Sequence, residues 1–158
     1  MDRVNLLVTE WMRAKLGVQE YIDAMPEDGI AFKPTSEIRS FAENYLHVAG
    51  TNYAFASAAS GRDNPYDMMK GKDPEQVEDL KQDKAALLEF VMGSYDFMLD
   101  AVKGLSDAAL DEDVEFFKMR MRRHVLLAKA MEHHAHHRGQ TAIYLRLKSI
   151  TPPSERLF

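Results

Sequence analysis

Residues 124–148 read HVLLAKAMEHHAHHRGQTAIYLRLK, and this stretch contains five of the six histidines of the chain. Gly139 is the one residue in it that interrupts a helical pattern. Beyond it, Pro152 and Pro153 prevent a helix from continuing much further than Lys148. We therefore predict a long helix that ends at about Lys148 and carries most of the histidines.

His133 and His137 form a candidate pair of metal ligands on this helix. At about 100° per residue they lie one above the other on the same face, whereas His134 and His136 point about 100° to either side. Two imidazoles with this spacing can bind one ion without bending the backbone. The alternative interpretation is a histidine-rich helix that is partly exposed. A third ligand elsewhere in the chain would favour the metal site over this alternative. The zinc protease motif His-Glu-x-x-His and the Glu-x-x-His pairs of di-iron bundles are absent.

His47 is the only histidine outside this stretch and is the natural third ligand. It falls near the middle of a predicted helix, roughly opposite the main apolar stripe, on the same face as Glu43, Asn44 and Thr51. A histidine that faces solvent would show the same pattern. His47 is therefore a ligand if this polar face lines a cleft, and a surface residue if it does not.

Three further helices are predicted upstream. The first covers about residues 4–25, and the second runs from an N-cap at Thr35 or Ser36 to about Ser60, with Ile38 in its apolar stripe. The third begins at the cap Asp73, followed by Pro74, and ends before Gly104, although Lys84 interrupts its apolar stripe. Residues 105–113 form a connector, and residues 114–119 fit either a short extended piece or the beginning of the last helix.

Four amphipathic helices without a convincing strand pattern predict an all-α fold, a four-helix bundle, as a single domain over residues 1–158. The helices could alternate up and down or include a crossover. The chain is 46% apolar and 28% charged, as in ordinary globular proteins. The formal net charge of −5 gives no reason to expect nucleic acid as a partner.

Cysteine is absent, which excludes a disulfide framework, a cysteine-based zinc site and a thiol nucleophile from the protein itself. No apolar stretch approaches the roughly 18 to 20 residues of a membrane span, and the N-terminus lacks a basic region followed by an apolar core. We therefore expect a cytoplasmic protein with no membrane partner.

Several motifs resemble those of the DinB-like (DinB/YfiT) superfamily, and the resemblance covers essentially the whole chain. They are His133-x-x-x-His137-Arg138-Gly139-Gln140, Tyr144-Leu145-Arg146, Pro152-Pro153 and Leu46-His47-Val48-Ala49. The resemblance implies a DinB/YfiT-type four-helix bundle, frequently a homodimer, with His47, His133 and His137 as ligands of one metal ion and with the remaining positions open. His134 is an alternative ligand within the histidine-rich run.

The resemblance also implies a cofactor and a class of chemistry. The ion is a divalent transition metal, and the substrate is a small molecule. Zinc and nickel are favoured because imidazole suits both. The chain then resembles either a metal-dependent hydrolase or an S-transferase that uses a low-molecular-weight thiol such as bacillithiol or mycothiol. A non-catalytic metal- or ligand-binding stress-response protein is the alternative.

Arg138 and Gln140 are the candidate cofactor-binding residues beside the histidines. Gln140 lies in the same row as the ligand pair and could orient a metal-bound water or a ligand histidine. Arg138 is interpreted first as pairing with a carboxylate in the bundle or at a dimer contact, and second as a substrate contact.

Overall fold

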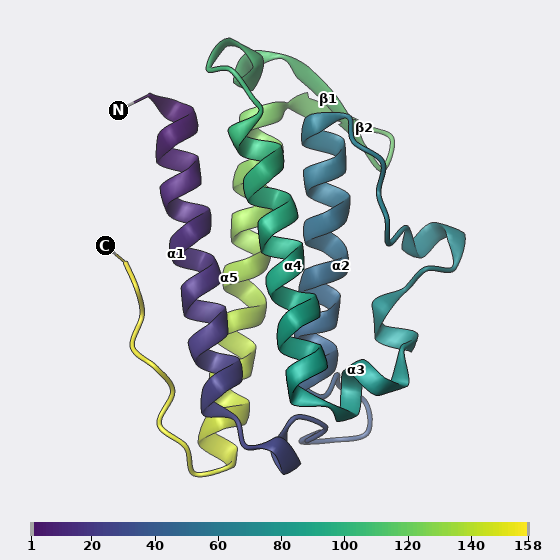
Figure 1. The fold of residues 1–158 in the computed structure, drawn as a ribbon, viewed down its shortest axis with the longest axis vertical. Coiled ribbons are helices and arrows are strands. Elements are labelled where there is room, and N and C mark those ends of the chain that lie inside the picture. Colours follow the sequence, from purple (N-terminus) through teal and green to yellow (C-terminus); the bar gives the residue numbers. More distant parts are fainter. Residues whose placement is uncertain (1, 158) are drawn as a thin grey trace.

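Four long helices lie side by side in the computed structural model, which describes residues 2–157 (Figure 1). They are α1 (Arg3–Ala24), α2 (Phe41–Ser60), α4 (Lys84–Lys103) and α5 (Arg123–Leu147). Short helices occupy the connections: η1 (Glu27–Gly29), η2 (Met68–Lys70), η3 (Pro74–Gln76), α3 (Glu78–Gln82) and η4 (Ala108–Asp111). The predicted all-α four-helix bundle is confirmed. Within the described residues, no helix is long and apolar enough to cross a membrane.

The chain crosses the length of the bundle between α2 and α4. Helices α1 and α5 run in one direction and α2 and α4 in the other (Figure 1). Two parallel neighbours need a long connection, and residues 61–83, which we call the crossover segment, supply it beside α2. The structure thus has the crossover, which helix periodicity had left as one of two arrangements.

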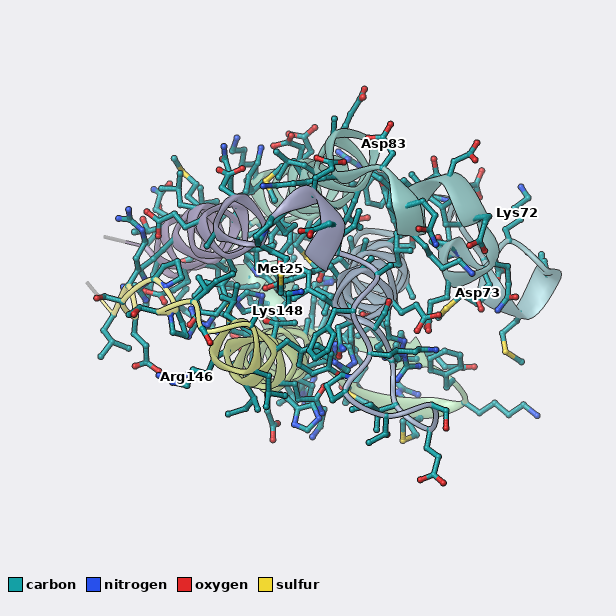
Figure 2. The ribbon with its side chains drawn as sticks, turned by 90° about the horizontal axis from the view of Figure 1, so that it is seen from below. Met25, Lys72, Asp73, Asp83, Arg146 and Lys148 are labelled. Carbon is teal, nitrogen blue, oxygen red and sulfur yellow. The ribbon has the colours of Figure 1, made fainter. Side chains whose placement is uncertain are left out.

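A continuous apolar core fills the space between the four long helices. Trp11 of α1, Leu46 of α2, Met98 of α4 and Leu126 of α5 are all fully buried in it. Met25, which follows α1, is also fully buried and lies between the helix ends in the view along the bundle (Figure 2). Burial of these side chains supplies the main favourable free energy of folding.

Helix α2 begins at a capping box formed by Ser40 and Glu43. Ser40 Oγ accepts from the Glu43 backbone N–H at 3.0 Å, and Glu43 Oε2 accepts from the Ser40 N–H at 2.7 Å. The predicted N-cap at Thr35 or Ser36 is therefore wrong, and Ile38 lies before the helix and is 42% exposed. Ser40 is favoured because it has a glutamate three residues later, which satisfies a second backbone N–H.

The third predicted helix starts at the expected cap but is not continuous. Asp73 caps η3 and Pro74 is its first residue, as predicted. The backbone then becomes extended at Asp83, whose carboxylate accepts from the Ala86 N–H at 3.0 Å and caps α4. Lys84, which interrupted the predicted stripe, is the first residue of α4 and donates its backbone N–H to Glu27. The single helix predicted from Pro74 to just before Gly104 is therefore wrong at Val77 and at Asp83, where the backbone is extended.

Residues 113–122 form a β-hairpin at the end of the bundle where α5 begins (Figure 1). Strands β1 (Asp113–Phe116) and β2 (Met119–Arg122) pair antiparallel, and Phe117 and Lys118 in the turn have φ of 46° and 65°. Two successive residues with positive φ match the twist of a two-residue hairpin. Of the two interpretations of residues 114–119, the extended one holds.

We expect Ser40→Ala to lower the free energy of unfolding by about 1 kcal/mol, because the variant loses the Oγ acceptor of the capping box. Urea denaturation measures the effect. Ser36→Ala is the matched control, since Ser36 is exposed and lies outside the helix. Equal stability of the two variants would show that the capping box does not stabilise α2.

Candidate metal centre

The polar face of α2 packs against α5 and brings three histidines together. His47 Nε2 lies 3.2 Å from His133 Nε2, and the ring centroid of His137 lies 4.8 Å from that of His47 and 4.6 Å from that of His133. One nitrogen from each ring falls within 4.8 Å of the others. The polar face that carries His47 therefore lines a cleft between two helices, which was the condition for His47 to act as a ligand.

His137 is oriented by Asn44, one helical turn before His47 on α2. The Asn44 side-chain amide donates to the Ser40 carbonyl at 2.9 Å, which turns its oxygen toward α5. That oxygen lies 3.1 Å from His137 Nδ1 and can only accept, so the ring proton belongs on Nδ1. Both residues are at most 5% exposed, and Nε2 of His137 is left without a proton.

His47 is oriented by Glu75 of the crossover segment. Glu75 Oε1 lies 3.0 Å from His47 Nδ1. Burial would raise the pKa of the Glu75 carboxyl, but hydrogen bonds from His47 and Arg39 outweigh it and lower that pKa to about 2. An ionised carboxylate can only accept, so His47 Nδ1 donates. Arg39 Nη2 lies 3.3 Å from His47 Nδ1, but it can only donate, and it donates to Glu75 Oε1 at 3.2 Å.

His133 is oriented by Thr51, one turn after His47 on α2. The Thr51 hydroxyl has two backbone carbonyls within 2.9 Å to receive its hydrogen, those of His47 and Val48. Its oxygen lies 3.3 Å from His133 Nδ1 and accepts from that nitrogen. His133 Nε2 is thus also free of a proton, like Nε2 of His137.

The Nε2 atoms of the three rings therefore turn toward the same space, where a cation would fit. Burial, and next the charge of His47, lowers the pKa of His133 to about 4, and burial and then His133 lower that of His137 to about 3. Both rings are neutral at pH 7. Zinc–nitrogen bonds of about 2.0–2.1 Å in tetrahedral geometry set two ligand nitrogens about 3.3 Å apart, close to the 3.2 Å between His47 and His133.

This group could hold a divalent metal ion and leave positions open. It consists, within residues 2–157, of three histidines without a carboxylate or other fourth ligand. Structural zinc sites normally use four protein ligands, whereas catalytic sites use three and keep one position for water or substrate. A metal ion bound by these three histidines would therefore keep at least one position for water or another small ligand.

The other histidines of α5 lie apart from this group. His134 is 3% exposed, and its Nδ1 lies 2.6 Å from the Tyr95 hydroxyl of α4. Burial lowers the pKa of His134 to about 3, so it is neutral in the core. His136 is exposed, and His124 Nδ1 lies 3.0 Å from the Leu110 carbonyl near the hairpin. Their directions agree with the helical spacing predicted from the sequence.

A cavity of about 900 Å³ opens beside His137, which is the one candidate ligand that lines it. Its walls come from α2, α5, the segment before α2 and the crossover segment, and include His137, Glu75 and Gln140. Gln140 is exposed and donates from Nε2 to His136 Nε2 at 3.0 Å. Arg138 is not among the lining residues, and its Nη1 lies near Gly17 of α1, 3.5 Å from where a Cβ would be.

Sequence reasoning did not identify Glu75 and Arg39 as part of the site. It also assigned no role to Asn44 and Thr51, although both share the face of His47. Their spacing of three and four residues from His47 was a usable signal, because such neighbours lie one turn away on a helix. Glu75 gave no such signal, since it belongs to a different element.

Comparisons with known proteins agree with the resemblance of the sequence motifs. The model of the DinB family matches residues 1–155. The structure is similar to that of a DinB-like protein from Bacillus cereus ATCC 10987, with a TM-score of 0.79, 15% sequence identity and coverage of 94% of each chain. It is also similar to the DinB-like protein YjoA from Bacillus subtilis, with a TM-score of 0.72, 21% identity and coverage of 96% of this chain and 97% of that chain. At such identities the structural likeness shows the fold alone. A search among curated proteins found no match.

We expect His133→Ala and His137→Ala to abolish stoichiometric zinc binding, whereas His134→Ala keeps it. His134→Ala should instead lower the free energy of unfolding by about 2–4 kcal/mol, because it leaves a cavity and an unpaired Tyr95 hydroxyl. Elemental analysis after desalting measures the metal, and urea denaturation measures the stability.

His136→Ala is the matched control and should change neither quantity, since His136 is exposed. His134→Asn provides a smaller change if the alanine variant does not fold. Loss of zinc from folded His134→Asn, together with its retention in His133→Ala, would reassign the ligand.

Proposed function

The chain belongs to the DinB family, and on that basis we propose that it is a metal-dependent enzyme. His47, His133 and His137 hold one divalent ion, with zinc and nickel favoured because imidazole suits both. The observation that carries this proposal is the convergence of three imidazole rings, each held by an oxygen partner on Nδ1. A closed structural site is not favoured, because the group offers only three ligands.

When bound, the ion supplies Lewis-acid chemistry, by activating a water molecule or by holding a thiolate as a nucleophile. The protein's contribution is orientation. Asn44, Thr51 and Glu75 keep the proton of each ligand ring on Nδ1, so the rings need not change tautomer when the ion binds. Such outer partners raise the basicity of the ligands and fix their direction.

The substrate is a small molecule that occupies the cavity next to His137. A volume of about 900 Å³ is within the usual range for small-molecule sites, about 300–1,000 Å³. His136 lines this cavity and accepts a hydrogen bond from Gln140 on Nε2, which leaves a ring proton on Nδ1. We assign His136 a role in proton exchange with the bound molecule, and Gln140 a role in orienting His136.

We favour a thiol S-transferase over a hydrolase. The chain has no cysteine, so a thiol nucleophile has to come from a second small molecule. The cavity supports this choice because it is far larger than one water molecule requires. A low-molecular-weight sugar-thiol is the class of cosubstrate that fits both its size and its mixed polar lining.

A cobalt-substituted protein tests this choice. Addition of a suitable thiol should produce sulfur-to-cobalt charge-transfer absorption in the near ultraviolet, and His47→Ala should abolish it because one ligand is lost. His124→Ala is the matched control, since His124 lies near the hairpin, away from the site. Both simple thiols and sugar-thiols are to be tried.

Two other outcomes would change the proposal. If no thiol alters the cobalt spectrum while a base titration does so near neutral pH, the hydrolase replaces the transferase. If the protein binds cobalt but no thiol, electrophile or ester is turned over, a non-catalytic metal-binding role replaces the enzyme.

We also propose that the chain forms a homodimer through its helices. Three large apolar side chains of α1 remain about half exposed, Leu6 at 48%, Met12 at 53% and Leu16 at 49%. Light scattering at tens of micromolar should give twice the chain mass of 18.0 kDa. Leu16→Lys should shift the mass toward the monomer, whereas Met69→Lys, in the crossover segment, should not. A monomeric mass for the unmodified protein would remove the dimer.

A further inference from the structure

The three oxygen partners of the histidine rings do not come from one element. Asn44 and Thr51 lie on α2, within one turn of His47. Glu75 lies on η3, 28 residues from His47, in the crossover segment. It is also the only charged partner of the three. The metal centre therefore includes one residue from a segment that belongs to none of the four long helices.

Besides the hydrogen bond to His47, two contacts and one internal hydrogen bond hold the crossover segment in place around Glu75. Glu75 forms a two-pronged ion pair with Arg39, just before α2, with distances of 2.8 and 3.2 Å. Pro74 is buried against Gly50, where an added Cβ would lie 3.4 Å from Pro74 Cδ. Asp73 accepts from the Glu75 N–H at 3.0 Å and fixes the backbone there. Figure 2 shows Asp73 at the side of the bundle, with Lys72 further out.

We propose that Glu75 is a positioning residue for the metal centre, and that through it metal binding is coupled to the docking of the crossover segment on α2. This inference rests on the metal site proposed above. The Glu75 carboxylate accepts a hydrogen bond from His47 Nδ1, which turns Nε2 of that ring toward His133. The negative charge of Glu75 makes His47 a stronger ligand for a cation. The neutral partners Asn44 and Thr51 have a smaller effect on their histidines.

Coupling of this kind is reciprocal. If the docked crossover segment raises the metal affinity by some factor, the bound metal must favour the docked segment by the same factor. A residue that only stabilises the fold would not give this pair of effects. The coupling can therefore be measured from both sides, without any assay of activity.

The first test measures zinc affinity by competition with a chelator. We expect Glu75→Ala to weaken binding by about 10- to 100-fold, and Glu75→Gln, which keeps an oxygen acceptor without the charge, to lie between that variant and the unmodified protein. Glu78→Gln is the matched control, because Glu78 is on the same segment but pairs with Lys81 at the surface. Thermal unfolding of the metal-free proteins shows whether the variants remain folded.

The second test measures amide hydrogen exchange in residues 61–83 with and without zinc. Zinc should slow exchange there in the unmodified protein and in Glu78→Gln, and the effect should be lost in Glu75→Ala. Wild-type zinc affinity in a folded Glu75→Ala variant, or exchange in residues 61–83 that zinc leaves unchanged, would overturn this inference alone. Failure of the unmodified protein to bind zinc or nickel would overturn the proposed function, and this inference with it.

Discussion

The arrangement of the site depends on giving every buried imidazole nitrogen a partner. A buried polar atom without a partner costs about 1–3 kcal/mol, and three rings lie together between α2 and α5. Asn44, Thr51 and Glu75 each satisfy one Nδ1. The three Nε2 atoms are left facing one another, and a cation between them can bind all three. The hydrogen bonds to the three Nδ1 atoms thus determine how strongly the space between the rings can bind a cation.

The two pairs of helices contribute differently to the bundle. Helices α1 and α4 contribute mainly apolar packing, whereas α2 and α5 contribute the histidines. Helix α5 contributes to the apolar core as well as to the histidine site, because its successive residues point in different directions. His133 and His137 face α2, while His134 turns its ring toward Tyr95 of α4. A run of four histidines in five residues therefore contains members of the site, a member of the core and an exposed residue.

Helical periodicity predicted the four long helices and the all-α bundle because each helix has its own apolar stripe. Periodicity could not predict the crossover, because an apolar stripe does not show whether its helix runs parallel or antiparallel to a neighbouring helix. The cap at Ser40 was missed although its signal, Glu43 three residues later, was in the sequence. The His133 and His137 row followed from spacing alone. His47 stayed open because a polar face looks the same toward a cleft as toward solvent, and Glu75 has no periodic relation to any histidine.

The separation of the ligands along the chain has a consequence for when an ion can be held. His133 and His137 are available as soon as α5 forms, but two imidazoles make a weak chelate. His47 is 86 residues away from His133, so the three-coordinate site exists only after α2 and α5 have docked. An ion bound there stabilises the native bundle over the unfolded chain by mass action. Metal retention then reports the completed tertiary structure, and a newly made chain acquires its full affinity only at the last stage of folding.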